Sequence, residues 1–144
     1  MLPMKKFLLF LGDIAILYLS LFLTLYIRYG RDFDIQFNFH LIPFTIIFAV
    51  WTVIFYVSSL YDISFTKNNV LFFSDLFYSI AAISAVSIFL FYFIPLFRIT
   101  PKTNFFIFTG ITVIMQVSWR FYFNHLTAKS GHKNNTIIIG LSQQ

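Results

Sequence analysis

The sequence contains no cysteine, and this absence excludes several kinds of chemistry. Without a thiol, the chain can form no disulfide, no thiolate nucleophile and no cysteine-ligated metal site. Charged residues are also scarce: they make up 10% of the 144 residues, whereas soluble domains contain about 25%. So few charged side chains cannot cover the surface of a soluble domain. The composition therefore places this chain in lipid.

The acidic residues are spread along the chain and include no glutamate. They are Asp13, Asp32, Asp34, Asp62 and Asp75. Hard cations need more oxygen ligands than two carboxylates supply, so Asp32 and Asp34 are not expected to bind a metal. His40, His125 and His132 have no partners at metal-ligand spacing and are expected to be solvated. The sequence thus predicts no catalytic residue, no metal site and no cofactor site in this chain.

Apolar residues, by contrast, make up 59% of the chain and fall into four blocks. The blocks are residues 7–27, 41–60, 72–94 and 105–123. A helix needs about 20 mostly apolar residues to cross the hydrocarbon of a bilayer, so each block predicts one transmembrane helix. The expected fold is an all-α membrane protein, with a four-helix transmembrane bundle over residues 1–128. The first block exceeds the roughly 7–15 apolar residues of a signal peptide, so we expect it to be retained.

Residues 129–144 have a different character. Polar residues there lead into Thr136–Gly140, where three consecutive isoleucines precede a glycine. Consecutive β-branched residues without polar alternation suit a strand that is buried on both faces of a parallel sheet. We therefore expect a linker and the truncated first β-strand of an α/β, nucleotide-binding-like domain, which would make this chain a fragment.

The basic residues indicate an orientation in the membrane. They occur singly or in pairs at the ends of apolar blocks, which does not favour a nucleic-acid partner despite the net charge of +5. With four spans, the side of the two termini carries six of them: Lys5, Lys6, Lys67, Arg120, Lys129 and Lys133. The opposite side carries four: Arg28, Arg31, Arg98 and Lys102. The positive-inside rule then predicts cytoplasmic termini.

Three ionisable residues in or beside the blocks are candidate polar or lipid-phosphate contacts: Asp13, Arg28 and Arg120. A polar group in lipid is costly unless it faces protein or water. Asp13, Ser20, Thr24 and Arg28 share one helix face, which we expect to point into the bundle. Asp13 could line a proton or substrate path, but a bond to a neighbouring helix is the simpler interpretation. Arg120 could bind a phosphate near the cytoplasmic surface, although anchoring the helix there is the simpler use.

Four further expectations concern the connections and the packing. Residues 28–40 show no periodicity and predict a solvated connection, whereas the two prolines within 95–102 predict a tight turn that starts the last helix. Trp51 lies deep in the second block and should pack between helices. The small residues within 81–87 should allow close helix contacts.

Several short motifs follow one another in a characteristic order. They are Asp13 with Ser20-Leu21, Arg28-Tyr29-Gly30, Leu60-Tyr61-Asp62, Thr100–Phe106, Trp119-Arg120 and Ile137–Gly140. Together they resemble the N-terminal membrane region of bacterial polyprenyl-phosphate sugar-phosphate transferases, the exopolysaccharide biosynthesis sugar transferase family. The resemblance covers most of the chain. It implies four helices in a bacterial inner membrane, followed by a cytoplasmic nucleotide-binding-like domain and a catalytic domain.

In that family, the catalytic domain moves a sugar phosphate from a nucleotide sugar to undecaprenyl phosphate in exopolysaccharide, O-antigen or capsule synthesis. Nothing in this sequence resembles the catalytic domain, so no catalytic residue is implied here, and Mg²⁺ is expected only in that absent domain. Two further departures are Ser59, where a glycine often precedes Leu-Tyr, and Gly140-Leu141-Ser142, which lacks the second glycine of a dinucleotide loop. The first predicts a less tightly turned end of the second helix.

Two alternatives remain open. The membrane region of nucleotide-sugar 4,6-dehydratases is closely similar and also has four helices. A small four-span lipid-linked sugar flippase or multidrug transporter is the third hypothesis, although such carriers tend to place an ionisable residue deeper than Asp13. The expected partners are the lipid bilayer, undecaprenyl phosphate and a second copy of the chain through the membrane helices.

The predicted topology can be tested with reporter fusions. A reporter fused after Asn69 or after Lys133 should read as cytoplasmic, because the basic residues favour that side for both positions. Paired alkaline phosphatase and fluorescent-protein fusions would measure this. A periplasmic signal at either position would contradict the four-span arrangement.

Overall fold

The computed structural model describes residues 2–61, 70–94 and 102–130, and all regular structure in these residues is helical. The elements are α1 (Leu2–Tyr29), the short 3₁₀ helix η1 (Gly30–Asp32), α2 (Phe33–Val57), α3 (Val70–Phe93) and α4 (Lys102–Ser130). The predicted strand Thr136–Gly140 and residues 95–101 of the predicted turn lie outside the described residues.

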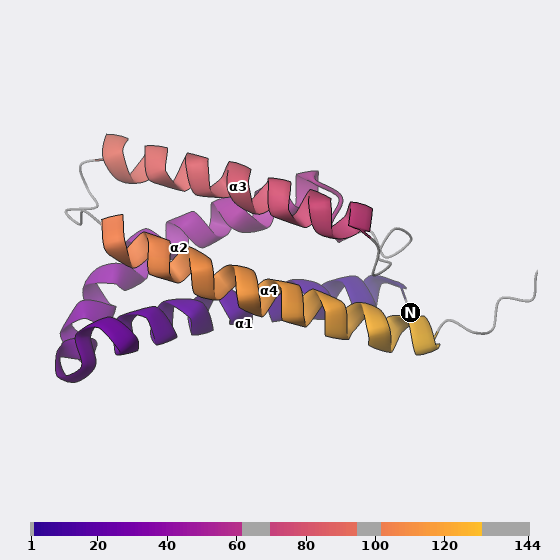
Figure 1. The fold of residues 1–144 in the computed structure, drawn as a ribbon, viewed down its shortest axis with the longest axis horizontal. Coiled ribbons are helices and arrows are strands. Elements are labelled where there is room, and N and C mark those ends of the chain that lie inside the picture. Colours follow the sequence, from indigo (N-terminus) through magenta and orange to yellow (C-terminus); the bar gives the residue numbers. More distant parts are fainter. Residues whose placement is uncertain (1, 62–69, 95–101, 131–144) are drawn as a thin grey trace, which may run out of the picture.

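Three helical stretches within the described residues are long and apolar enough to cross a membrane: Met4–Val57, Val70–Phe93 and Thr103–Thr127. Their length and composition indicate a membrane protein. The first stretch contains both α1 and α2. Gly30, whose φ of +49° lies in the left-handed region, reverses the chain between them, so α2 runs back along α1 (Figure 1).

The expectation of a solvated connection over residues 28–40 was wrong, because α2 already begins at Phe33. The ring of Phe33 packs edge-on against Phe22 of α1, with centroids 4.8 Å apart, and stacks on Phe37 at 5.3 Å. Polar residues alternate with these aromatic residues in the sequence and hide the helical periodicity. Contact with α1 stabilises a helix that the local pattern does not indicate.

The helices form a bundle in which α1 lies against both α4 and α2, while α3 packs on α2 and touches α4 (Figure 1). The beginning of α1 and the end of α4 lie at the same end of this bundle. Residues from opposite ends of the sequence therefore become neighbours.

Aromatic rings fill the centre of the bundle. Phe108 of α4 contacts Phe44 and Trp51 of α2, with ring centroids 5.2 and 5.7 Å apart. Trp51 is fully buried, and its indole Nε1 donates to the Ser87 hydroxyl of α3 at 3.3 Å. The prediction that Trp51 packs between helices is confirmed.

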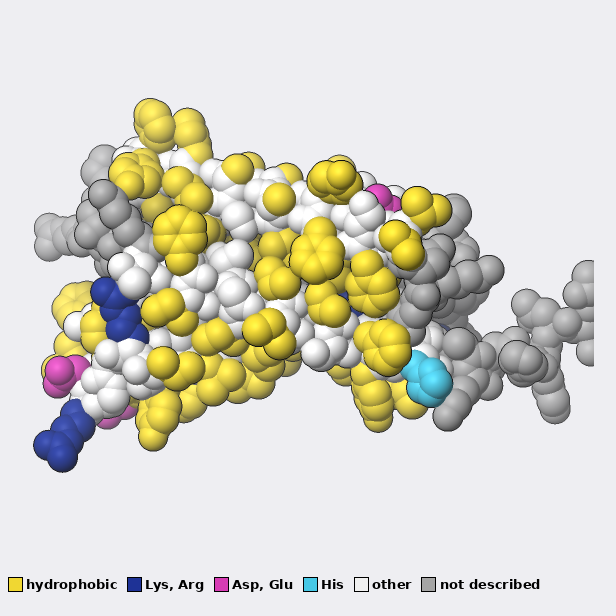
Figure 2. Space-filling model, in the orientation of Figure 1, with side chains coloured by type: hydrophobic (Ala, Val, Ile, Leu, Met, Phe, Trp, Pro, Cys, Tyr) yellow, Lys and Arg dark blue, Asp and Glu magenta, His cyan; other side chains and the backbone are white. Residues whose placement is uncertain are grey.

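The outer surface of the bundle is apolar. Figure 2 shows hydrophobic side chains over the middle of one face, with the described Lys, Arg, Asp and His side chains gathered near the two ends. Such a surface is suited to lipid.

The small-residue cluster of α3 only partly packs inside: Ser87 is buried, but Ala81, Ala82 and Ala85 are exposed. The predicted close helix contact is therefore absent at these alanines in the described part of the chain.

A glycine brings α1 and α4 close together. A Cβ atom placed on Gly12 of α1 would overlap the indole ring of Trp119 on α4. Trp119 can lie flat against α1 only because Gly12 has no side chain, which is the usual reason for a glycine at a membrane helix contact. By contrast, a Cβ on Gly110 of α4 would meet nothing within 4 Å.

We expect Gly12→Ala to destabilise the bundle by about 1–3 kcal/mol, because overpacking forces the rigid indole out of place. The free energy of unfolding, measured by steric trapping in bicelles, would report the change. Gly110→Ala is the matched control, and it should be neutral or stabilise by up to about 1 kcal/mol through its higher helix propensity. Equal effects of the two substitutions would contradict the proposed contact.

Candidate functional site

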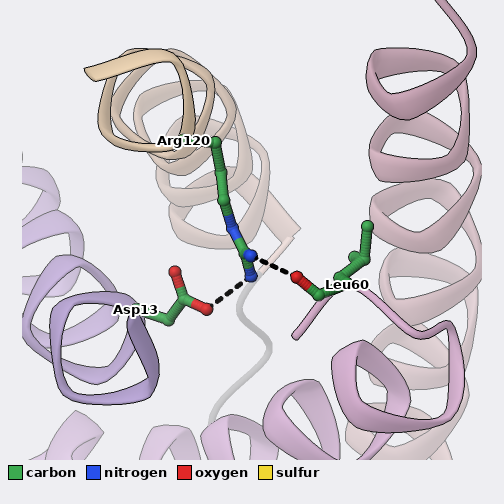
Figure 3. Close-up of polar contacts among 3 residues, drawn as sticks. All are labelled: Asp13, Leu60 and Arg120. Carbon is green, nitrogen blue, oxygen red and sulfur yellow. Dashed lines mark hydrogen bonds and ion pairs between the residues drawn. The ribbon is translucent and has the colours of Figure 1, made fainter. Parts of the chain in front are cut away.

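A buried ion pair joins the first and last helices. The Asp13 carboxylate of α1 accepts a hydrogen bond from Arg120 of α4, with Oδ2 and Nη2 2.6 Å apart (Figure 3). Neither side chain is exposed. The hypothesis that Asp13 bonds a neighbouring helix is confirmed.

Arg120 also ties the end of α2 into this site. Its Nη1 donates to the backbone carbonyl of Leu60 at 2.6 Å (Figure 3). The guanidinium lies 5.6 Å from the ring centroid of Phe55 and 5.2 Å from that of Tyr61. Aromatic faces attract cations, so these two rings both cover and stabilise the buried charge.

The expectation that Arg120 anchors α4 at the membrane surface was therefore wrong. The apolar block that ends at residue 123 suggested a helix end close by, but α4 continues to Ser130. Thr112, Gln116 and Arg120 are fully buried at spacings of four residues, and such a polar row marks one face of a helix. This extended row was the sequence signal that indicated a buried arginine.

The carbonyl that binds Arg120 belongs to a Schellman turn. The Leu60 amide donates to the Phe55 carbonyl and the Ser59 amide to the Tyr56 carbonyl, both at 3.1 Å, which is the hydrogen-bond pattern of this helix ending. Ser59 has a φ of 56°, in the left-handed region that favours glycine. The expected loosening of this helix end is not observed, because serine adopts the conformation that glycine takes more easily.

Further polar groups surround the Asp13 carboxylate, namely those of Tyr61, Gln116 and Trp119. Burial, followed by the nearby Asp13 charge, raises the pKa of the Tyr61 hydroxyl, which keeps it a neutral phenol. The ion pair is thus surrounded by other polar groups inside the bundle.

Arg28, the third candidate residue, does not join this site. Its side chain is exposed and lies over the ring of Tyr29, with Cζ 5.5 Å from the centroid. Ser20 and Thr24, which share its predicted helix face, are fully buried. The prediction of an inward-facing polar row is correct for Asp13, Ser20 and Thr24 and wrong for Arg28, where α1 ends.

A second polar cluster lies at the opposite end of the bundle. The Asn104 amide Nδ2 lies 2.9 Å from both the Tyr29 hydroxyl and His40 Nε2. His40 Nδ1 lies 2.7 Å from the Gln36 carbonyl, so Nδ1 carries the proton and Nε2 accepts from Asn104. His40 is only 2% exposed. The expectation that it is solvated was wrong, because α2 begins seven residues before it.

Breaking the ion pair should cost more than replacing it. We expect Arg120→Met alone to destabilise the bundle by about 3–5 kcal/mol, because it leaves the Asp13 carboxylate buried without a partner. Asp13→Leu should have a similar effect for the reciprocal reason. The double variant should be less destabilised than the sum of the two, as a double-mutant cycle of unfolding free energies would show.

Arg28→Met is the matched control for Arg120→Met. Because Arg28 is exposed, its replacement should change stability by no more than about 0.5 kcal/mol. Additive effects of Asp13→Leu and Arg120→Met would contradict the coupling between the two residues.

Ser59→Gly should stabilise the protein by about 1 kcal/mol, because glycine adopts a positive φ without the strain of a Cβ atom. Thermal unfolding in detergent would measure the change. Ser58→Gly is the control, because Ser58 has a φ of −75° and gains nothing from glycine. Destabilisation by Ser59→Gly would mean that the serine side chain has a specific role.

Comparison of the sequence with protein-family models and curated proteins, and comparison with solved structures, gave no match. Function therefore has to be inferred from the polar clusters of this chain and from the resemblance of its motifs.

Proposed function

We propose that this chain is a four-helix membrane anchor of the type that precedes the cytoplasmic domains of polyprenyl-phosphate sugar-phosphate transferases. The supporting observation is that residues from the separate motifs of that resemblance meet in space. Asp13, Tyr61 and Arg120 come from three motifs, and they lie together in one buried site.

The second polar cluster supports the same proposal. Tyr29 belongs to the motif that closes the first block, and Asn104 belongs to the motif that opens the fourth. Their side chains are joined by a hydrogen bond of 2.9 Å. In both clusters, the motif residues link helices to one another, which is the role that an anchor requires.

In this proposal, each of α1 to α4 crosses a bacterial inner membrane and the termini are cytoplasmic. The shortest of them, α3, has 24 residues, more than the roughly 20 needed to span the hydrocarbon. A cytoplasmic domain beyond the membrane helices carries the chemistry, with its Mg²⁺, and undecaprenyl phosphate reaches it from the bilayer. A second copy of the chain is a further proposed partner within the membrane.

The burial of Asp13 favours an anchor over a carrier. In a proton or substrate carrier, the ionisable group must exchange ligands with a water-filled path. Asp13 is instead enclosed and bonded to Arg120. Its carboxylate serves helix packing in this structure.

A chimeric protein would test the proposal directly. Residues 1–130 of this chain should replace the membrane region of a full-length transferase of this family with retention of at least part of its activity. An unrelated four-helix membrane bundle is the control, and it should support less activity. A chimera that inserts in the membrane but is inactive would contradict the proposed kinship.

By itself, the chain should transfer no sugar phosphate. Phosphoryl transfer needs groups that bind metal ions and neutralise phosphate, yet Asp13 is paired, while Asp32 and Asp75 lie exposed in different elements. The assay would incubate purified protein with labelled nucleotide sugar, Mg²⁺ and undecaprenyl phosphate. Labelled lipid product that is lost in Asp13→Asn would overturn this prediction.

A further inference from the structure

We propose that the cluster of Tyr29, His40 and Asn104 is a pH-sensitive contact. It joins α1, α2 and α4 while His40 is neutral, and it opens this end of the bundle when the imidazole takes up a proton. The hydrogen bonds of the cluster support this independently of the proposed function.

Each member of the cluster comes from a different helix. Tyr29 ends α1, His40 lies in the first half of α2, and Asn104 lies in the first turn of α4. Asn104 Nδ2 lies 2.9 Å from the Tyr29 hydroxyl and 2.9 Å from His40 Nε2, so its two N–H groups bind two other helices. His40 is 2% exposed and Asn104 is 4% exposed. Water therefore does not compete for these bonds.

Protonation of His40 changes the chemistry of a single atom, Nε2. Nδ1 already donates to the Gln36 carbonyl, 2.7 Å away, and it keeps this bond in both states. In the neutral ring, Nε2 has a lone pair that accepts from Asn104, whereas in the imidazolium both ring nitrogens are donors. Two donors would then face each other at 2.9 Å, and the bond between α2 and α4 would be lost.

Rotation of the Asn104 amide does not remove the cost of protonation. The rotated amide would present Oδ1 to His40 Nε2, and the Tyr29 hydroxyl would donate to the same oxygen. These hydrogen bonds would be satisfied, but the imidazolium would be a buried cation that is bound only by neutral groups. A buried charge is unfavourable unless an opposite charge pairs with it.

The charged side chains near His40 do not supply this partner. Arg28 of α1 acts on the imidazole with a positive charge, which repels a second one. Arg31 and Asp32 of η1 and Asp34 of α2 are exposed, and in the described part of the chain neither aspartate forms an ion pair with His40. Acid therefore favours an opened state in which the imidazole reaches water.

The cluster lies close to the water at its end of the bundle. Asn38, two residues before His40, is exposed. In the predicted topology, this end is on the side of the membrane opposite the termini, so that His40 responds to the pH outside the cytoplasm. Opening is confined to this end, because the pair of Asp13 and Arg120 joins α1 to α4 at the other.

The first test measures the free energy of unfolding of the purified full chain in bicelles, from about pH 8 to about pH 5, where histidine titrates. Acidification should lower the ratio of folded to unfolded protein about tenfold. His40→Gln should remove this loss, because a glutamine oxygen accepts from Asn104 at any pH. His125→Gln is the matched control, since His125 is exposed, and it should leave the loss unchanged. Equal pH profiles of the unmodified chain and His40→Gln would contradict the proposal.

Asn104→Asp should reverse the pH dependence. Its carboxylate accepts from the protonated Nε2 of His40 and pairs with the positive charge, so stability should rise between about pH 8 and about pH 6 as His40 becomes protonated. Asn38→Asp adds the same charge at an exposed position of α2 and should keep the loss in acid. If Asn104→Asp lost stability in acid as the unmodified chain does, the proposal would be wrong.

Spin labels locate the opening, because the chain has no cysteine that would take up a second label. Cysteines at positions 27 and 106 report on the cluster end of α1 and α4, and cysteines at positions 8 and 122 report on the opposite end. The native side chains, Ile27, Phe106, Leu8 and Tyr122, are all exposed. Acid should broaden the distance distribution of the first pair and leave the second unchanged. Equal broadening of both pairs, or no change in either, would overturn the proposal.

Discussion

A charge that is buried inside a membrane bundle must find its partner within the protein, and the rest of this structure depends on that constraint. Removing either side chain would leave the other in a medium of low polarity, at a cost of several kcal/mol. Asp13 and Arg120 therefore fix the position of α1 relative to α4. The second donor of Arg120, which binds the Leu60 carbonyl, extends this constraint to the end of α2.

Close approach of the helices is the condition under which the pair can form. Arg120 reaches across the helix contact and makes a 2.6 Å hydrogen bond from each of two donors. Its neighbours must therefore leave the guanidinium little freedom to move. Gly12 allows Trp119 to lie against α1, and Ser59 accepts a left-handed conformation that turns Leu60 toward the guanidinium. A small residue of α1 and a strained residue just after α2 thus each favour one of the two hydrogen bonds of Arg120.

The helices and the inward position of Asp13 could be predicted from the sequence, because hydropathy and the spacing of polar residues depend on local pattern alone. The beginning of α2 could not, since its helical state depends on the contact between Phe22 and Phe33. The wrong expectation that His40 is solvated had the same cause, because it also placed the beginning of α2 too late. Arg120 was misplaced for a related reason: a basic residue near the end of an apolar block is usually an anchor, and only its neighbour in space, Asp13, reveals a different role.

Apolar packing alone does not fix helix positions in lipid, because lipid tails are as apolar as the side chains that they replace. The aromatic centre around Phe108 fills space, and similar contacts would form if a helix slid along its neighbour. Polar contacts lack this freedom, because a shift of one residue breaks them. The Asp13–Arg120 pair and the Tyr29–Asn104 bond both join α1 to α4. Two such bonds at opposite ends of one helix pair fix its register, whereas one bond would leave the far end free to rotate.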